Sequence, residues 1–383
     1  MVYVHPLYLL DNLRPRLGEW PQCGRLVERE KIMKLCAVLA VVGIMTALLP
    51  KTKSLGAETQ PEQPKYQISK VVLLGPPDRW DYVVFDPESH RVYVAHGDRV
   101  TVVDGLGGAI IGDIDGMPGG THGVAISHAT GKGYTDDGKA GVAVEFDLQT
   151  LKVVKRIRAE SDADGIVFDP TSGHIFVIDG DSGKLTVIDP KTDEVVATID
   201  GGGGLEFGDS GDNGKLYVDG TEKNEIVRVD TAKNVADAHW PMPTCVRPHG
   251  LAIDRVHHRL FATCSNKVMV VMNTDNGAVS ATLPIGQGSD FAVFDPERGL
   301  AFSSNRDGTL SVIAEMSPEN FVALFAIPTQ LGARTMAIDP KSGRIYLVTA
   351  EMTVNESAAP ADARHRYSIK PDSVRLLFLD RTP

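Results

Sequence analysis

This chain of 383 residues has no long apolar run, few cysteines and no excess of basic charge, and each of these features excludes a class of protein. The longest uncharged apolar run, 35–49, is shorter than the roughly 20 residues that a membrane-spanning helix needs. Four cysteines occur, none of them in a Cys-x-x-Cys-His run, so covalently attached haem is excluded. Asp and Glu total 50 against 39 Lys and Arg, which argues against nonspecific binding of nucleic acid or anionic membranes.

The first 57 residues have the composition of an export leader. Lys31 and Lys34 precede the apolar run, and a Ser-Leu-Gly-Ala stretch ending at Ala57 follows it. This order predicts a signal peptide over 33–57, with an uncleaved anchor as the alternative. Residues 1–32 carry no domain-like pattern and are interpreted as an upstream misread start. We therefore expect a periplasmic or secreted bacterial protein.

Cleavage of this leader changes both the charge and the cysteine content. The leader holds eight basic and four acidic side chains, so 31 Lys and Arg remain against 46 Asp and Glu, a net charge of −15. We expect no nucleic-acid partner and no stable membrane insertion. Cys23 and Cys36 leave with the leader, and Cys245 and Cys264 remain. In an oxidising compartment these two are predicted to form a disulfide, the alternative being two buried thiols.

The same pattern returns seven times between Asp81 and Pro383. A short turn opens each unit, at intervals of 41 to 44 residues, with an Asp or Ser at Asp86, Ser127, Asp169, Ser210, Asp254, Asp295 and Asp339. Seven positions later stands an aromatic each time: Tyr93, Tyr134, Phe176, Tyr217, Phe261, Phe302 and Tyr346. A period near 40 with four short strands per unit is typical of a β-propeller blade.

The predicted fold is therefore all-β, a seven-bladed β-propeller with four antiparallel strands, A to D, in each blade. In the third unit the strands are predicted at 165–168, 175–178, 185–189 and 195–199. The last unit ends after strand C at Asp380, whereas an unmatched strand at 71–74 precedes the first. We expect this N-terminal strand to complete blade seven, which removes open sheet edges and favours a monomer.

The domain organisation follows from these boundaries: a leader (1–57), a linker (58–69) and one propeller domain (70–383). One irregular insertion, Glu351 to Asp372, separates strands B and C of the last blade. Its composition predicts a mobile loop, with a lid or a partner contact as the alternatives. Three tryptophans are too few for the docking repeats of quinoprotein propellers, so no PQQ is expected. Gly201–Gly204 precedes no helix, so no nucleotide is expected either.

The residues five positions before each turn are predicted to surround the mouth of the central channel. They include two histidines and four carboxylates, namely Asp81, His122, Asp164, Glu206 (with one residue of slippage), His249 and Asp290, with Thr335 in the seventh blade. Such groups suit a divalent metal and acid–base chemistry. The alternative is a ring of solvated polar side chains in a wet channel. Arg247 and Arg334 flank the mouth and suit an anionic ligand or surface ion pairs. The other histidines near the opposite face, His90, His128, His174, His257 and His258, are interpreted as surface residues.

Two segments of the chain resemble a known family. Val-Phe-Asp-Pro-Glu-Ser-His-Arg-Val-Tyr-Val-Ala at 83–94 and Ala-Ile-Asp-Pro-Lys-Ser-Gly-Arg-Ile-Tyr-Leu-Val at 337–348 resemble the YVTN repeats of exported, YncE-like seven-bladed propellers. The resemblance implies a periplasmic propeller of bacterial type. It implies no catalytic residue, because members of that family mostly lack an assigned reaction.

Two functions are consistent with the sequence. The first is a noncatalytic module that binds a small ligand, a metal or a periplasmic protein at the rim. The second is a lactonase-like hydrolase or lyase, supported by fold analogy alone. In that enzyme His122 or His249 acts as the base, Glu206 or Asp164 as its partner or a metal ligand, and Arg247 or Arg334 as the anion holder. The two differ in geometry, because only the enzyme needs His122 and His249 to converge on one pocket.

Overall fold

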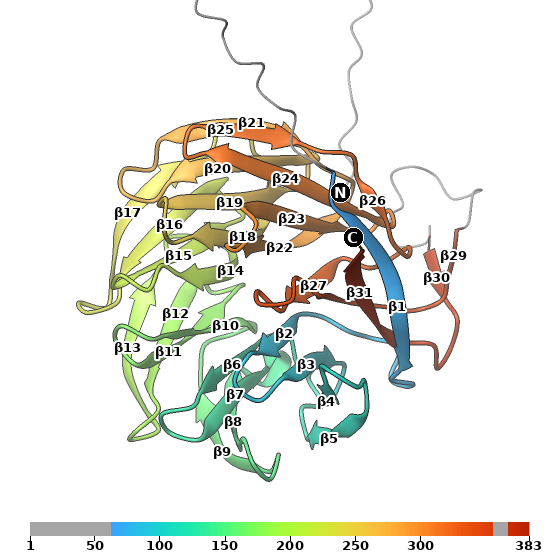
Figure 1. The fold of residues 1–383 in the computed structure, drawn as a ribbon. Coiled ribbons are helices and arrows are strands. Elements are labelled where there is room, and N and C mark those ends of the chain that lie inside the picture. The colour runs from blue at the N-terminus through green and yellow to red at the C-terminus, as the bar shows by residue number, and fades with distance from the viewer. Residues whose placement is uncertain (1–62, 355–366, 383) are drawn as a thin grey trace, which may run out of the picture. The chain divides into compact units, whose positions relative to one another are not determined.

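The repeated turns and aromatics produce seven blades, six of four strands and one of five, in the computed structural model, which describes residues 63–354 and 367–382 (Figure 1). Blade one contains β2 (Val83–Asp86), β3 (Arg91–His96), β4 (Arg99–Asp104) and β5 (Ile110–Asp115). Blade two contains β6 (Val124–Ser127), β7 (Lys132–Asp137), β8 (Val142–Asp147) and β9 (Val153–Arg158), with a 3₁₀ turn, η1 (Gly138–Ala140). Blade three contains β10 (Ala163–Asp169), β11 (His174–Asp179), β12 (Lys184–Asp189) and β13 (Glu194–Asp200).

The remaining blades follow the same order. Blade four contains β14 (Leu205–Ser210), β15 (Lys215–Gly220), β16 (Glu225–Asp230) and β17 (Val235–Pro241). Blade five contains β18 (Pro248–Asp254), β19 (Arg259–Cys264), β20 (Val268–Asn273) and β21 (Val279–Pro284). Blade six contains β22 (Ser289–Asp295), β23 (Leu300–Asn305), β24 (Thr309–Ser317), β25 (Asn320–Ala323) and β26 (Ile327–Pro328). Blade seven contains β27 (Thr335–Ile338), β28 (Ile345–Thr349), β31 (Arg375–Thr382) and β1 (Lys65–Leu73). The prediction of a seven-bladed propeller is confirmed.

Blade six departs from the four-strand plan. Its outermost strand is split, because β25 and β26 pair with different parts of the long strand β24. The other six blades have four strands each, all antiparallel. Innermost strands of successive blades contact one another around the whole ring, and β27 contacts β2.

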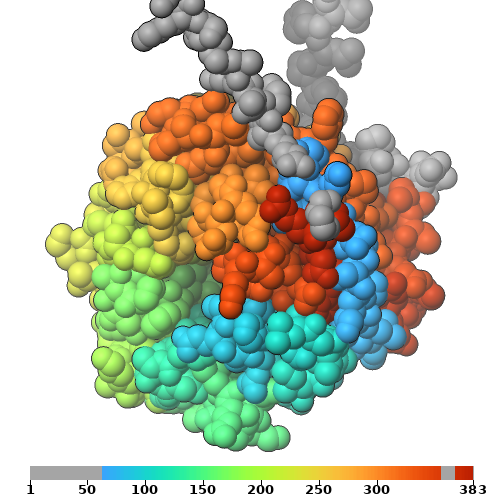
Figure 2. All heavy atoms as spheres, in the orientation of Figure 1, coloured from blue at the N-terminus to red at the C-terminus, as the bar shows by residue number. Residues whose placement is uncertain are grey.

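The N-terminal strand completes the last blade. β1 pairs antiparallel with β31 from Lys65↔Thr382 to Leu73↔Arg375, so the sheet order is β1-β31-β28-β27. Figure 2 shows the atoms of β1, in blue, alongside the dark red atoms of the C-terminal strand. The strand begins at Lys65, six residues before the predicted start at Val71, so the predicted linker 58–69 extends too far. The leader itself, 1–57, lies outside the described residues.

The insertion in blade seven is more ordered at its ends than predicted. β29 (Met352–Val354) and β30 (Tyr367–Ile369) pair antiparallel as a two-stranded ribbon. The expectation of an irregular loop from Glu351 to Asp372 is therefore wrong for these two segments. The middle of the insertion, 355–366, lies outside the described residues.

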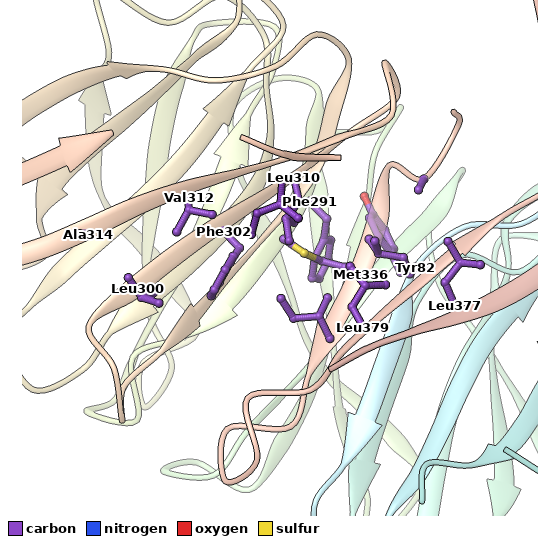
Figure 3. Packing of buried hydrophobic residues seen from close by; sticks show 14 residues of the cluster. Tyr82, Phe291, Leu300, Phe302, Leu310, Val312, Ala314, Met336, Leu377 and Leu379 are labelled. Atoms are coloured by element: carbon purple, nitrogen blue, oxygen red, sulfur yellow. The ribbon is translucent and has the colours of Figure 1, made fainter. Parts of the chain in front are cut away.

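The repeated aromatic residues form the packing between blades. All seven are buried, each exposing at most 1% of its surface. They belong to the hydrophobic clusters that fill the space between neighbouring sheets. Figure 3 shows one such cluster, with Phe302 among side chains of blades six and seven. Burial of each large side chain contributes about 1.5–3 kcal/mol to the stability of the fold. The repeated aromatics are therefore core residues.

The turn residues are buried for a different reason. In five blades an Asp carboxylate at the end of strand A accepts a backbone N–H two or three residues later, and so closes the A-to-B turn. Such Asx turns suit Asp because its short side chain reaches its own backbone.

Cys245 and Cys264 form the predicted disulfide, with Cα atoms 5.4 Å apart. It ties the loop before β18 to the end of β19.

Candidate functional site

β-Bulges at the start of the innermost strands position the polar residues of the channel mouth. In blades three, five and six the cross-strand register skips one residue, which is Asp164, His249 and Asp290 respectively. In blade four it skips two, Glu206 and Phe207, which explains the slippage in the repeat. A bulged residue lies outside the regular ladder, so its side chain can turn away from the pleat. The same local irregularity therefore recurs in blades three to six, whereas Thr335 of blade seven pairs regularly with Val348.

The first group at the mouth surrounds His122. Its Nδ1 lies 2.7 Å from Asp136 Oδ1 and 3.8 Å from Asp164 Oδ1. Asp136 also accepts backbone N–H groups of His122 and Gly123 through Oδ2, at 2.9 and 2.8 Å. On the other side of the ring, Arg79 Nη2 lies 3.1 Å from His122 Nε2. His122 is thus held at Nδ1 by a carboxylate, with a guanidinium close to its other ring nitrogen.

These carboxylates control the charge of His122. Burial alone lowers the pKa of this imidazole, but the hydrogen bond and charge of Asp136, with Asp164 and Asp81, outweigh it and raise the pKa from 6.5 to about 10. The Arg79 contact opposes this trend, because Nε2 must be unprotonated to accept from a guanidinium. Three carboxylates face one guanidinium here, so we assign the imidazolium form at neutral pH. His122 is accordingly a poor general base.

The second group joins blades four, five and six. Ligand-type atoms of Glu206, His249 and Asp290 all lie within 4.8 Å of one another. His249 Nδ1 is 3.3 Å from Glu206 Oε1, yet this buried nitrogen has no hydrogen-bond partner among the described residues. Two carboxylates and one imidazole are a donor set that suits Zn²⁺ or Mn²⁺. These three residues are the part of the mouth that could hold a metal.

Arg334 connects this group to blade one. Its Nη1 pairs closely with Asp290 Oδ2, and its Nη2 lies 3.6 Å from Asp81 Oδ2. Burial raises the pKa of Asp81, while the Arg334 charge lowers it only in part. The same Nη2 donates to the Trp80 carbonyl at 3.5 Å. Because Arg334 already neutralises Asp290, a metal there must compete with a guanidinium.

Behind Glu206 lies a carboxyl group that the repeat pattern did not identify. Asp219, in β15, is fully buried, and neither of its carboxylate oxygens has a hydrogen-bond partner among the described residues. Burial raises the pKa of Asp219 well above its usual 3.8, with a further contribution from the Glu206 charge. Burial therefore favours the protonated form of Asp219 relative to an exposed aspartate.

The channel below the polar ring is closed by aromatic side chains. Tyr82, Phe207 and Phe291, from blades one, four and six, pack with ring centroids 4.7 to 5.3 Å apart. Tyr82 and Phe291 are buried, and Figure 3 shows them beside Met336. At this level the channel is lined by aromatic rather than charged side chains. The mouth is a shallow polar ring above an aromatic floor.

Two clefts open beside this ring. One, of about 250 Å³, lies between blades six, seven and one and is lined by Asp78, Arg79, Trp80, Arg306, Gly332, Arg334, Met352, Tyr367 and Ile369. The other, of about 290 Å³, is acidic and lies between blades three and four. Its lining includes Asp162, Asp164, Glu206 and Glu222, with Arg247 as the basic side chain. The two candidate arginines therefore occupy different environments.

The predicted residues thus separate into two groups. His122 and His249 do not share one cluster, because no group of three ligand-type atoms that includes His122 is found in the described part of the chain. Arg334 is an ion-pair residue, whereas Arg247 makes no ion pair with a described residue. Arg79, Asp136 and Arg306 were not predicted from the sequence. Asp136 carried a signal, because two consecutive aspartates, Asp136 and Asp137, end strand B of blade two.

Comparisons with known proteins support the fold and give one kind of sequence relative. No family model matches the chain. The chain is 26% identical over 202 residues to the uncharacterized protein YncE of Salmonella typhimurium, covering 51% of this chain and 56% of that protein. YncE of Salmonella typhi matches to the same extent. The chain therefore spans about half the length of the curated relatives it matches, and it is YncE-like at that level.

Solved structures resemble the chain in fold alone. A chain of the mitotic checkpoint complex has a TM-score of 0.66 at 15% identity, covering 93% of this chain and 99% of that one. Hydrazine synthase of Kuenenia stuttgartiensis has a TM-score of 0.62 at 14% identity, covering 70% and 92%. The fold and the YncE-like relative support a generic interaction module. Within the described residues, no helix has the length and apolar character needed to cross a membrane.

Proposed function

We propose that this chain is an exported, noncatalytic binding propeller that holds a small organic anion in the cleft lined by Arg79, Arg306 and Arg334. The observation that carries the proposal is the meeting of three guanidinium groups with an apolar wall on an otherwise acidic protein. Guanidinium groups bind carboxylates and phosphates through paired N–H donors. The leader predicted over 33–57 and the Cys245–Cys264 disulfide support the exported location.

The three arginines differ in how many of their N–H donors are already paired with other side chains. Arg334 is paired with Asp290 and Asp81, and one nitrogen of Arg79 contacts His122. Arg306 has no carboxylate partner among the described residues. It is therefore the side chain best placed to pair with the charged group of a ligand, with Arg79 as its neighbour.

The opposite wall of the cleft favours an apolar or aromatic body on the ligand. Trp80 is buried at its edge, and Met352 and Tyr367 come from the two ribbon strands β29 and β30. Gly332, at φ +82°, brings backbone close to Met352, whose sulfur would lie 2.2 Å from an added Cβ. A side chain at position 332 would therefore displace Met352 and narrow the cleft. Such a lining fits an aryl carboxylate or an aryl phosphate.

A test of this proposal compares two arginines at the same mouth. Phenyl phosphate and benzoate are titrated into the mature protein by calorimetry, and the titration is repeated with Arg306→Ala and Arg247→Ala. We expect Arg306→Ala to weaken binding about tenfold or more, since a charged hydrogen bond is worth about 1.5–3 kcal/mol. Arg247→Ala, in the acidic cleft, should leave it unchanged. Equal losses in both variants, or no binding to the unsubstituted protein, would overturn the proposal.

A second candidate function is a metal-dependent hydrolase or lyase of lactonase type, favoured by the convergence of Glu206, His249 and Asp290. In that role His249 and the two carboxylates hold a divalent metal, which would supply a Lewis acid and an activated water. The Arg334–Asp290 pair and the separation of His122 from this group count against it. Lactone hydrolysis that depends on added Zn²⁺ and is abolished in His249→Ala would favour this candidate over the binding module.

A further inference from the structure

A separate cluster of ligand-type side chains lies at the far end of the innermost strands, where the A-to-B turns are. Asp254 ends β18, His257 stands in the following turn, and Glu315 comes from β24 of the next blade. His257 Nδ1 is 2.6 Å from Asp254 Oδ2 and 3.1 Å from Glu315 Oε1. His249 and Asp254 are five residues apart on β18, or roughly 17 Å along a strand, so this cluster is distinct from the mouth.

Glu315 is the unusual member of this cluster. Only 2% of its side chain is exposed, and neither of its carboxylate oxygens has a hydrogen-bond partner among the described residues. His257 Nδ1 is close, but its hydrogen-bond geometry is satisfied toward Asp254. An isolated buried carboxylate is costly unless a cation or a set of donors compensates it. Protonation of Glu315 or a bound cation would remove that cost.

The nearby arginine does not supply that compensation. Arg259 donates to the carbonyl oxygens of His257, His258 and Pro318, and it pairs closely with the carboxylate of Glu319. Its donors are thus directed at the turn backbone and at another acid. The cluster therefore keeps two carboxylates of its own against a single imidazole.

We propose that Asp254, His257 and Glu315 form a binding site for a divalent transition-metal ion, with Zn²⁺ as the probe of choice. Their ligand-type atoms lie within 4.8 Å of one another. Ligand atoms on a tetrahedral Zn²⁺, each about 2.0–2.2 Å from the ion, are roughly 3.3–3.6 Å apart, close to the 3.1 Å between His257 Nδ1 and Glu315 Oε1. Two carboxylates and one imidazole bind such an ion and balance its charge.

The site has an entrance and a structural consequence. The His257 side chain is about half exposed, so the ion reaches its nitrogen from solvent. Because Asp254 and His257 belong to blade five and Glu315 to blade six, the bound ion joins two neighbouring sheets. Metal binding should then stabilise the folded ring against unfolding, since the unfolded chain does not hold the three ligands together.

The test is a Zn²⁺ titration of the metal-free mature protein, by competition with a chromogenic chelator, in parallel with Glu315→Gln and His257→Ala. Glu315→Gln keeps the shape of the side chain, so its fold is checked by circular dichroism and thermal melting. We expect either change to weaken Zn²⁺ binding at this site at least about tenfold, as loss of even an outer-shell partner does. His258→Ala, in the same turn, should retain the affinity, and His249→Ala should remove only ions held at the mouth.

A second measurement reads the position of the ion directly. Crystals soaked in Zn²⁺ should give an anomalous peak between Asp254, His257 and Glu315, and Zn²⁺ should raise the melting temperature of the unsubstituted protein but not of Glu315→Gln. The proposal is overturned if Zn²⁺ affinity is the same in Glu315→Gln and His257→Ala as in the unsubstituted protein, or if no anomalous peak occurs there. Failure at this site leaves the anion cleft untouched, because the two lie at opposite ends of the strands.

Discussion

His122 and His249 occupy the same position of the repeat, yet their surroundings differ. His122 has Asp136 at one ring nitrogen and Arg79 at the other. His249 has Glu206 at 3.3 Å and no hydrogen bond at Nδ1. One imidazole is thus charged and held by a carboxylate, whereas the other has a buried nitrogen with no hydrogen-bond partner among the described residues. The position of a residue in the repeat therefore determines where its side chain lies, whereas the residues of the neighbouring blade determine its hydrogen bonds and charge.

The largest effect that would break this comparison comes from Asp136→Ala. It removes the acceptor of one imidazole and two backbone N–H groups, all part-buried or buried. We expect the free energy of unfolding to fall by about 3–5 kcal/mol, as for other broken buried ion pairs. Urea denaturation measures the loss. Asp181→Ala, an exposed acid on the same rim, serves as the control, and a loss no greater than in that control would contradict the role given to Asp136.

The disulfide is a second difference between the two histidines. It anchors the loop that leads into His249, whereas the loop that leads into His122 has no such bond. Replacing Cys245 and Cys264 with serine should lower the free energy of unfolding by about 3 kcal/mol, from the restored freedom of the unfolded chain. A reductant should destabilise the unsubstituted protein by a similar amount and leave the double variant unaffected. Sensitivity of the double variant to reductant would show that the bond is not the source of the effect.

The raised pKa of His122 predicts that the stability of the fold depends on pH. A histidine whose pKa is higher in the folded than in the unfolded state stabilises the fold fully below about pH 6.5. That contribution is lost as the pH rises from 6.5 to about 10. We expect unfolding free energies measured across this window to fall with pH, and the slope to flatten in His122→Gln. An unchanged slope in that variant would refute the assignment.

The smallest expected effect is that of His249→Ala on stability. Since Nδ1 of His249 makes no hydrogen bond with a described residue, its removal should change the free energy of unfolding by less than about 1 kcal/mol. Thermal and urea denaturation both measure this difference. A loss as large as that of Asp136→Ala would mean that His249 is a structural residue after all.

The fold was predictable because its signal repeats. Each turn residue and each aromatic carries little information alone, but seven copies at one spacing leave a single architecture, and the closure of blade seven followed from the missing strand. The start of β1 was not predictable. Its first residues lie at the edge of the sheet and are mostly exposed, so Lys65 to Lys70 show no apolar alternation.

The site was predictable only in part. The bulges that turn Asp164, His249 and Asp290 out of the ladder leave no clear mark in the sequence, although the recurrence of polar residues at this position pointed to them. Contacts between blades left no mark either. His257 is exposed, as predicted from its place near an A-to-B turn, but its contact with Glu315 was not predictable, because Glu315 lies in a different repeat about 60 residues away. Local patterns cannot report which side chains two blades bring together.

The pairing of β1 with β31 also sets an order of events during folding. Ser69 donates a hydrogen bond to the carbonyl of Phe378, 309 residues later in the chain. The first strand of the propeller to be synthesised must therefore wait for one of the last before it has a partner. Closing so long a loop is entropically costly and slow, so ring closure should be a late step, with six blades formed before the seventh. Until then the nascent chain has an unpaired strand that other chains, or a chaperone, can bind.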